Sequence, residues 1–261
     1  MKKDSWNPSQ YEKFKNERSQ PFLDLLDLVQ PFSEGKVIDL GSGTGELTSL
    51  MHDTFKPRAT VGFELSDAML EKAKRFSKPG LSFVQGNIEN WKPNDTYDLA
   101  LSNAAIQWCS DHVEIFSKIK SALKTGGQIA VQMPMNHDYP THVLAKSLSE
   151  EPEWSGLLKG QTYNKFNVML APEDYARLLF KLGFKEQNVF VKVYGHTLES
   201  REQVVEWVKG SMLTHFQSRL SEENYDKFLS EFRERLFKIL PDERPFFYPF
   251  KRIFIWGRLD K

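Results

Sequence analysis

Three glycines, Gly41, Gly43 and Gly45, have the spacing in this chain that most clearly indicates a ligand-binding turn. They follow an apolar segment that ends at Asp39 and Leu40, and they precede a segment with helical spacing of apolar residues. Glycine allows backbone dihedrals and close approaches that a Cβ atom would forbid. The pattern therefore predicts a strand, a tight turn and a helix, with a small ligand lying directly against the turn.

The glycine spacing differs from that of two common phosphate-binding motifs. The dinucleotide fingerprint is G-x-G-x-x-G, and the phosphate loop of nucleoside triphosphatases ends in Gly-Lys-Ser/Thr. This chain has Asp-x-Gly-x-Gly-x-Gly, and no lysine follows the last glycine. The expected ligand is therefore not held by a phosphate clamp.

Polar residues at the ends of further strand-like segments indicate which ligand the turn accepts. In open α/β sheets, ligands bind outside the carboxyl ends of the strands. Glu64 ends the second predicted strand, placed to accept hydrogen bonds from a ribose diol. Asn87 and Ile88 follow the third, where an amide beside an apolar side chain suits an adenine ring, and Asn103 follows the fourth. Together they predict a site for a nucleoside with an amino-acid end.

Strand-like and helix-like segments alternate along the chain, which is typical of a parallel sheet covered by helices. We expect an α/β fold with a doubly wound, mostly parallel, seven-stranded Rossmann-like sheet, and Ser66 and Asp111 each beginning a helix. A helical lid is predicted as an insertion before the last strand. Residues 1–261 are expected to form a single domain, with a core of about 32–135, 170–195 and 246–259 and a lid from 1–30, 136–169 and 200–245.

Composition excludes several classes of protein. Lys plus Arg and Asp plus Glu both number 35, so no net charge favours nucleic acid or an anionic membrane as a partner. The 20 phenylalanines argue for a packed core, and the lone Cys109 for a reducing compartment without disulfides. No apolar run approaches 18 residues and the N-terminus lacks a signal peptide's apolar segment. We therefore expect a cytoplasmic protein, whose oligomeric state the sequence leaves open.

Two further kinds of site find no support in the sequence. The 6 histidines include no H-x-x-x-H pair and there is no second cysteine, so no metal site is expected. The nucleophile elbow G-x-S-x-G is also missing, because Gly41-Ser42-Gly43 lacks its spacing. Metal-dependent and serine-nucleophile hydrolysis are therefore disfavoured.

The chain resembles class I S-adenosylmethionine-dependent methyltransferases. The resemblance is carried by the residues at the strand ends together with Lys124–Gly127, a predicted turn before the fifth strand. The resemblance implies S-adenosylmethionine as cofactor and S-adenosylhomocysteine as product. It implies that Glu64 binds both ribose hydroxyls, that Asn87 and Ile88 frame the adenine, and that Gly41 approaches the methionine portion. The implied cofactor-binding residues are Asp39, Gly41, Ser42, Gly43, Gly45, Glu64, Leu65, Asn87, Ile88 and Asn103. The chain departs from the family at Asn87, where an acid is more common.

Flanking segments extend the likeness to nearly the whole chain. Residues 6–26, 103–108, 132–142, 206–210 and 248–255 resemble segments of the trans-aconitate methyltransferases. This resemblance implies O-methylation of a small carboxylic acid such as trans-aconitate. The chain has Thr214-His215 where that family commonly has Arg-Pro. If that arginine helps to hold a tricarboxylate, the acceptor of this chain carries fewer charges.

Methylation of a carboxylate requires positioning more than acid–base catalysis. A carboxylic acid with a pKa near roughly 4 is already ionised at neutral pH. Alignment of the oxygen, the methyl group and the sulfur can contribute roughly 7–11 kcal/mol. The expected acceptor-positioning candidates are cationic Arg18, Lys209 and Arg252 and neutral Tyr11, His142 and Tyr248. Each also has a structural interpretation: Arg252, for example, alternates with apolar residues on a strand and could face solvent.

Three alternatives stay open at this stage. The acceptor could be another small carboxylate or a hydroxyl. The chain could bind S-adenosylmethionine as a sensor without catalysis, because a fold does not fix a function. A nicotinamide-dependent oxidoreductase is the remaining rival, and it predicts affinity for NAD. A calorimetric titration with S-adenosylmethionine and with NAD separates the oxidoreductase from the other possibilities, and binding without methyl transfer to any acceptor would favour the sensor.

Overall fold

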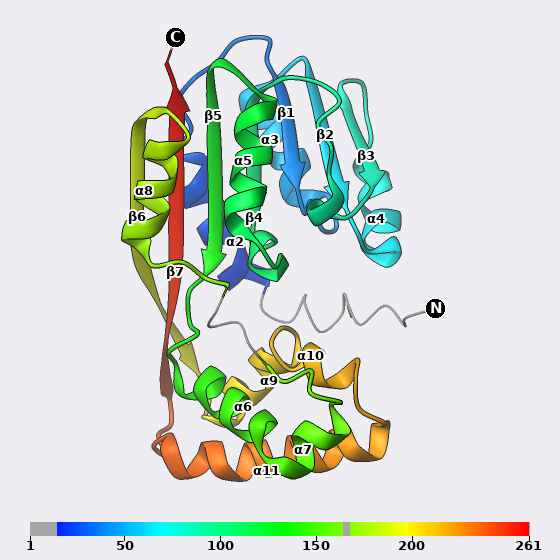
Figure 1. The fold of residues 1–261 in the computed structure, drawn as a ribbon, viewed down its shortest axis with the longest axis vertical. Coiled ribbons are helices and arrows are strands. Elements are labelled where there is room, and N and C mark those ends of the chain that lie inside the picture. Colours follow the sequence, from blue (N-terminus) through cyan, green and yellow to red (C-terminus); the bar gives the residue numbers. More distant parts are fainter. Residues whose placement is uncertain (1–14, 164–167, 261) are drawn as a thin grey trace. The chain divides into compact units, whose positions relative to one another are not determined.

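A seven-stranded sheet organises this protein, whose computed structural model describes residues 15–163 and 168–260 (Figure 1). The strand order is β3-β2-β1-β4-β5-β7-β6. The first five strands pair in parallel, and β7 runs antiparallel to β5. The mostly parallel sheet predicted from the sequence is therefore confirmed. The strands are β1 (Lys36–Leu40), β2 (Ala59–Glu64), β3 (Leu81–Gln85), β4 (Tyr97–Asn103), β5 (Leu123–Pro134), β6 (Phe184–Leu198) and β7 (Phe246–Leu259).

Helices connect the strands, and several begin at residues whose side chains cap them. Ser66 accepts a hydrogen bond from the N–H of Met69, and Asp111 accepts one from the N–H of Glu114, which confirms both predicted helix starts. The α-helices are α2 (Lys15–Leu26), α3 (Glu46–Phe55), α4 (Asp67–Ala73), α5 (His112–Ala122), α6 (Pro140–Glu150), α7 (Pro152–Leu157), α8 (Pro172–Lys181), α9 (Glu202–Lys209), α10 (Thr214–Gln217) and α11 (Glu222–Ile239). The 3-10 helices are η1 (Lys74–Phe76), η2 (Ile88–Asn90) and η3 (Ile106–Trp108).

The central strands are buried because helices cover both faces of the sheet. In Figure 1, α5 lies over one face while α2 and α3 lie on the other. The strand β1 is buried along Val37–Leu40, and Phe116 and Ile119 on α5 are also buried. A parallel sheet covered on both faces needs such continuous apolar strands. Within the described ranges, no helix combines the length and the apolar character that crossing a membrane would require.

Strands β5 and β6 are longer than the sequence pattern predicts. The segment Lys124–Gly127, expected as a turn, instead lies inside β5, where the pairing with β4 shifts register near Tyr97. Gly126 with φ of 75° permits this irregularity. The strand β6 starts at Phe184, before the part of the strand that its sequence pattern indicates. Its early residues are mostly exposed, so they lack the alternation of apolar and polar side chains that marks a strand.

The described chain divides into two compact units. Residues 16–134, 168–192 and 252–260 contribute to the first, and residues 135–163 and 193–251 to the second. The first, the sheet unit, contains the central strands and every described residue predicted to bind the cofactor. The second, the helical unit, contains most of the two later segments predicted to form a lid. Their action as a lid stays a prediction.

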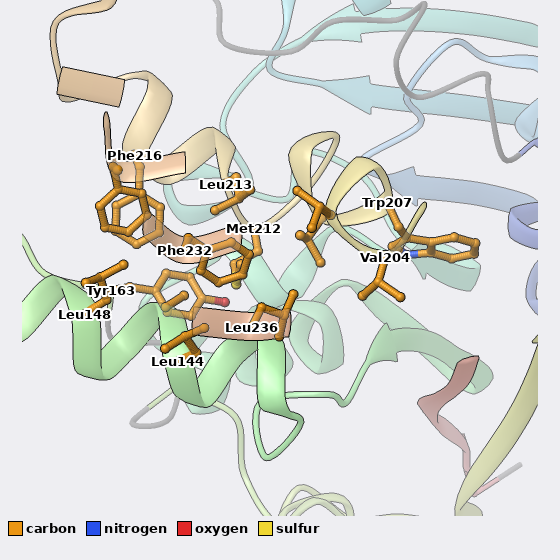
Figure 2. Close-up of a cluster of buried hydrophobic side chains, with 14 of the residues drawn as sticks. Leu144, Leu148, Tyr163, Val204, Trp207, Met212, Leu213, Phe216, Phe232 and Leu236 are labelled. Carbon is orange, nitrogen blue, oxygen red and sulfur yellow. The ribbon is translucent and has the colours of Figure 1, made fainter. Parts of the chain in front are cut away.

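The helical unit has its own apolar core, built on α6, α9 and α11 (Figure 2). Phe228 stacks on Phe216 with ring centroids 4.2 Å apart and meets the edge of Trp154 at 5.1 Å. Phe232 and Leu236 continue the same buried face of α11 at helical spacing. The helical character predicted for residues 200–245 is therefore confirmed over α9, α10 and α11.

Candidate active site

The glycine turn between β1 and α3 has the left-handed backbone that its sequence predicts. Gly41, Gly43 and Gly45 have φ angles of 89°, 56° and 79°. A Cβ atom on Gly41 would lie 2.1 Å from Cβ of Ala105, and one on Gly45 would lie 2.8 Å from Ala73. A Cβ on Gly43 would meet nothing within 4 Å. The outer glycines therefore permit tight packing, whereas Gly43 leaves space next to the backbone that a ligand can enter.

Glu64 lies next to this turn because it ends the neighbouring strand β2. Its Oε2 accepts a hydrogen bond of 2.9 Å from the N–H of Gly43, and its Oε1 accepts one of 2.8 Å from the N–H of Ser66. Each carboxylate oxygen can accept a further hydrogen bond. The side chain is thus fixed at the turn with acceptor capacity left for a diol. Leu65, the next residue, is 60% exposed at the same strand end.

Asp39 is the most perturbed acid at the turn. It is 3% exposed, and its Oδ2 accepts a hydrogen bond of 2.6 Å from the hydroxyl of Thr48. Its Oδ1 is buried and has no hydrogen-bond partner among the described residues. Burial raises the pKa of the Asp39 carboxyl to about 7; the Thr48 hydrogen bond opposes this rise and the charge of Glu64 adds to it. A buried carboxylate oxygen that lacks a hydrogen-bond partner among the described residues is suited to bind a cationic group of a ligand.

The ends of β3 and β4 supply the remaining predicted cofactor residues. Asn87 caps η2, because its Oδ1 accepts a hydrogen bond of 2.9 Å from the N–H of Glu89. Ile88 is near the turn, since its Cδ1 would be 3.7 Å from a Cβ placed on Gly41. Asn103 ends β4, and its Oδ1 is buried without a hydrogen-bond partner in the described part of the chain. The structure therefore brings the predicted cofactor residues of all four strands to one edge of the sheet.

Ser42 and Ala104 add two features to this edge. The Ser42 hydroxyl is buried and, among the described residues, makes no hydrogen bond. Ala104 has φ of 54°, unusual for a residue with a Cβ, and its N–H donates to the carbonyl of Gln132 at 2.8 Å. Strained backbone often accompanies a ligand site, and here it stands directly after Asn103.

Arg252 is the acceptor candidate that belongs to the sheet unit with a described side chain. It is 5% exposed on β7, so the interpretation that it faces solvent is wrong. Its Nη1 donates to Oε1 of Gln132 at 3.2 Å. Gln132 is a residue that the sequence reasoning missed. The strand-end rule, applied to the fifth predicted strand as well as to the first four, finds it.

The other acceptor candidates have different surroundings. In the helical unit, Lys209 forms an ion pair of 2.9 Å with Glu206, and the Nδ1 of His142 lies 3.0 Å from the hydroxyl of Thr141. Tyr248 is 5% exposed, and burial raises the pKa of its hydroxyl. Tyr11 lies outside the described residues, and Arg18 belongs to α2 but its side chain is not described.

Comparisons with known proteins agree with this geometry. The model of a family described as "Methyltransferase domain" matches residues 31–189. A trans-aconitate 2-methyltransferase of Deinococcus radiodurans is 37% identical over 95% of this chain and 96% of its own length. One of Mycobacterium sp. (strain KMS) is 33% identical over 97% and 99%.

Solved structures share the fold. An S-adenosylmethionine-dependent methyltransferase of Thiobacillus denitrificans, in complex with S-adenosyl-L-homocysteine, matches with a TM-score of 0.53 at 16% identity, over 99% of this chain and 93% of that one. The YcgJ protein of Bacillus subtilis matches with a TM-score of 0.61 at 14% identity, over 93% and 99%. At these identities the likeness concerns the fold alone. No group of side chains that could hold a metal occurs among the described residues.

Proposed function

This chain belongs to the methyltransferase family that includes the trans-aconitate 2-methyltransferases, and we propose that it methylates a carboxylate of a small acid such as trans-aconitate with S-adenosylmethionine. The observation that carries the proposal is the edge formed by Asp39, Gly43 and Glu64. At this edge the buried Oδ1 of Asp39 has no hydrogen-bond partner among the described residues. Gly43 has open space beside its backbone, and a hydrogen bond from its N–H fixes the Glu64 carboxylate.

The residues of this edge fit the parts of S-adenosylmethionine. Glu64 has acceptor capacity for both ribose hydroxyls, and Leu65 and Ile88 offer apolar surface to the adenine. Asp39 has a buried oxygen for the ammonium of the methionine portion. The carbonyl oxygen of Asn87 already accepts one hydrogen bond, and its amide group can still donate to a ring nitrogen of the adenine. These roles are part of the proposal.

When bound, S-adenosylmethionine supplies an electrophilic methyl group on a sulfonium, which a carboxylate oxygen attacks as the carbon–sulfur bond breaks. The reaction consumes one positive and one negative charge and transfers no proton, so the protein needs no general base. The chain's own residues therefore act by binding and alignment. Glu64 and the glycine turn fix the nucleoside, and Asp39 orients the methionine end against it.

A screen of small carboxylic acids with S-adenosylmethionine labelled in its methyl group tests the proposal. We expect alkali-labile methyl esters with trans-aconitate or a related acid. Alkali-stable products would assign the methyl group to another kind of acceptor, such as a hydroxyl. Tight binding of S-adenosylmethionine without transfer to any acid would favour the sensor. Binding of NAD instead would contradict the proposed cofactor.

A further inference from the structure

The strand β6 ends the strand order of the sheet, and on its outer side it has no strand neighbour among the described residues. We propose that this edge pairs in antiparallel fashion with β6 of a second copy of the chain, which makes the protein a symmetric dimer whose sheet continues from one copy into the other. The dimer goes beyond the proposed methyltransferase function and does not depend on it.

The first support is the length of the open edge. The edge of a sheet presents backbone N–H and C=O groups that can pair with another strand, and proteins commonly limit this by keeping an edge strand short or covering it. At one end of the sheet β3 has only 5 residues, whereas β6 at the other end has 15 (Figure 1). Residues 185–188 and 191–193 of β6 are exposed. The described elements therefore leave most of this stretch open to solvent.

The second support is the apolar character of the same stretch. Val189, Phe190 and Val191 are consecutive, and β-branched and aromatic residues favour strands. Phe190 stacks on Phe254 of β7 with ring centroids 5.1 Å apart, which attaches the strand to the sheet. On the opposite face, Val191 and Val193 are 37% and 56% exposed. An exposed edge with apolar side chains favours pairing with a further strand.

The charges of β6 indicate that this further strand is a second β6. In a symmetric antiparallel pair centred on Val189, Glu186 lies opposite Lys192 of the second copy, and Lys192 lies opposite Glu186 of the second copy. Residues directly opposite each other in such a pair interact, and opposite charges there stabilise the pairing. The remaining charged residue of the strand, Lys185, lies opposite Val193. The register therefore contains opposite-charge pairs and no like-charge pair.

Neighbouring registers lack this complementarity. Symmetric pairing keeps each side chain on its own face of the sheet, so the centre moves by whole residues. With the centre at Asn188, Glu186 lies opposite Phe190, and with the centre at Phe190 it lies opposite Tyr194. Both ion pairs are lost in either case, so the charges select the register centred on Val189.

Contacts within the chain place the two charged side chains on one face, as this register requires. Glu186 bonds to Gln30 and Arg258, and Lys192 forms an ion pair of 2.6 Å with Asp24 on α2. The side chains of Glu186 and Lys192 remain 47% and 45% exposed. A carboxylate can accept about four hydrogen bonds and an ammonium can donate three, so each has capacity for the second copy in addition to its own partners.

Sedimentation velocity and hydrogen exchange of the wild type test the dimer. The paired edges form an interface at the small end of the usual range, so we would cover protein concentrations of about 1–500 µM. We expect the dimer fraction to rise with concentration, and the amides of residues 186–192 to exchange more slowly as it rises. A monomer at every concentration would overturn the inference and leave the edge to a strand of another protein. A dimer without slower exchange in β6 would assign the interface to another surface and also overturn it.

Charge reversal tests the register. Lys192→Glu places like charges opposite each other at both ion pairs, and so does Glu186→Lys. Each variant alone is therefore expected to raise the Kd of the dimer at least about fivefold. Lys74→Glu is the matched control, because it makes the same charge change in an exposed ion pair of 2.9 Å with Glu71. Lys74 begins η1, which contacts β3 at the other end of the sheet. It is expected to leave the Kd unchanged.

Mixing the two variants separates a lost contact from lost folding. In a mixed dimer, one copy carries two carboxylates and the other two ammonium groups, so both cross-strand pairs are attractive again. We expect the mixture of Lys192→Glu and Glu186→Lys to form mixed dimers at least about fivefold more tightly than either variant pairs with itself, and more so at low salt. No gain on mixing two folded variants would overturn the register. If either variant does not fold, the exchange of the wild-type β6 amides with concentration decides the question.

Discussion

The Glu64 carboxylate accepts a hydrogen bond of 2.9 Å from the N–H of Gly43, and this bond joins the end of β2 to the glycine turn that follows β1. The glycine is one whose Cβ would meet only open space, so the bonded pair borders the place left for a ligand. The same carboxylate also accepts from Ser66, the cap of α4. One acid thereby links the glycine turn to the start of the next helix.

Glu64→Ala is expected to weaken the binding of S-adenosylmethionine. Hydrogen bonds to a charged group are each worth roughly 1.5–3 kcal/mol, so losing those to the ribose raises Kd at least about tenfold. Glu64→Gln keeps the shape of the side chain and one acceptor oxygen, so its Kd is expected to lie between those of the wild type and Glu64→Ala. Calorimetry measures Kd, and Glu71→Ala, at an exposed acid on α4, is the control. An unchanged Kd in Glu64→Ala would contradict the proposed role.

Gly41→Ala and Gly43→Ala are expected to act on different properties of the protein. Both residues have positive φ, which costs a non-glycine residue roughly 1–2 kcal/mol. At Gly41 the new Cβ would also collide with Ala105, so we expect a loss of folding stability of more than about 2 kcal/mol. At Gly43 the Cβ enters the ligand's space, so Kd rises while stability falls by only the smaller amount. Urea unfolding measures the stability, and calorimetry measures the Kd. Equal effects of the two variants on stability and on Kd would contradict this distinction.

Phe228→Ala tests the core of the helical unit. Phe228 is fully buried between Phe216 and Trp154. Removing a buried phenylalanine leaves a cavity and costs roughly 3–5 kcal/mol. We expect a loss of that size in urea unfolding, compared with less than about 1 kcal/mol for Phe247→Ala, because Phe247 is 62% exposed. Equal losses would mean that the packing on α11 contributes little to stability.

The sequence predicts the arrangement at the ends of β1 and β2 better than the surroundings of Arg252, for a physical reason. The residues at the ends of β1 and β2 lie within a local pattern, because one strand and its following turn bring Asp39 and Gly43 together. Arg252 meets Gln132 only through the antiparallel pairing of β7 with β5, across 120 residues of chain. Nothing in the alternation around Arg252 indicates which neighbours that pairing supplies, so solvent and a buried partner were equally consistent with it.

The exposed start of β6 escaped prediction for a related reason. Its residues from Lys185 to Asn188 are exposed, so their side chains carry no burial pattern, although the backbone is extended. The hydrophobic alternation that indicates a strand arises from one buried face. The sequence pattern of an edge strand with little burial therefore indicates only the central part of that strand.

Asp39 is expected to make both stability and cofactor binding depend on pH near neutrality. Burial raises its pKa from 3.8 to about 7, so between these values the folded protein holds a proton that the unfolded chain has lost. Without ligand, the contribution of Asp39 to the free energy of unfolding therefore falls as pH rises from about 4 to 7, by at most about 4 kcal/mol, and is flat above. The free energy of unfolding of the wild type minus that of Asp39→Asn, measured with urea at pH 5 and at pH 8, isolates this contribution.

An ammonium at Oδ1 favours the ionised carboxylate, so the Kd of S-adenosylmethionine is expected to decrease from pH 6 to pH 8 with release of a proton. Calorimetry in buffers of different ionisation enthalpy counts that proton. A Kd that does not change over this range, or that changes equally in Asp39→Asn, would show that Asp39 does not bind the ammonium.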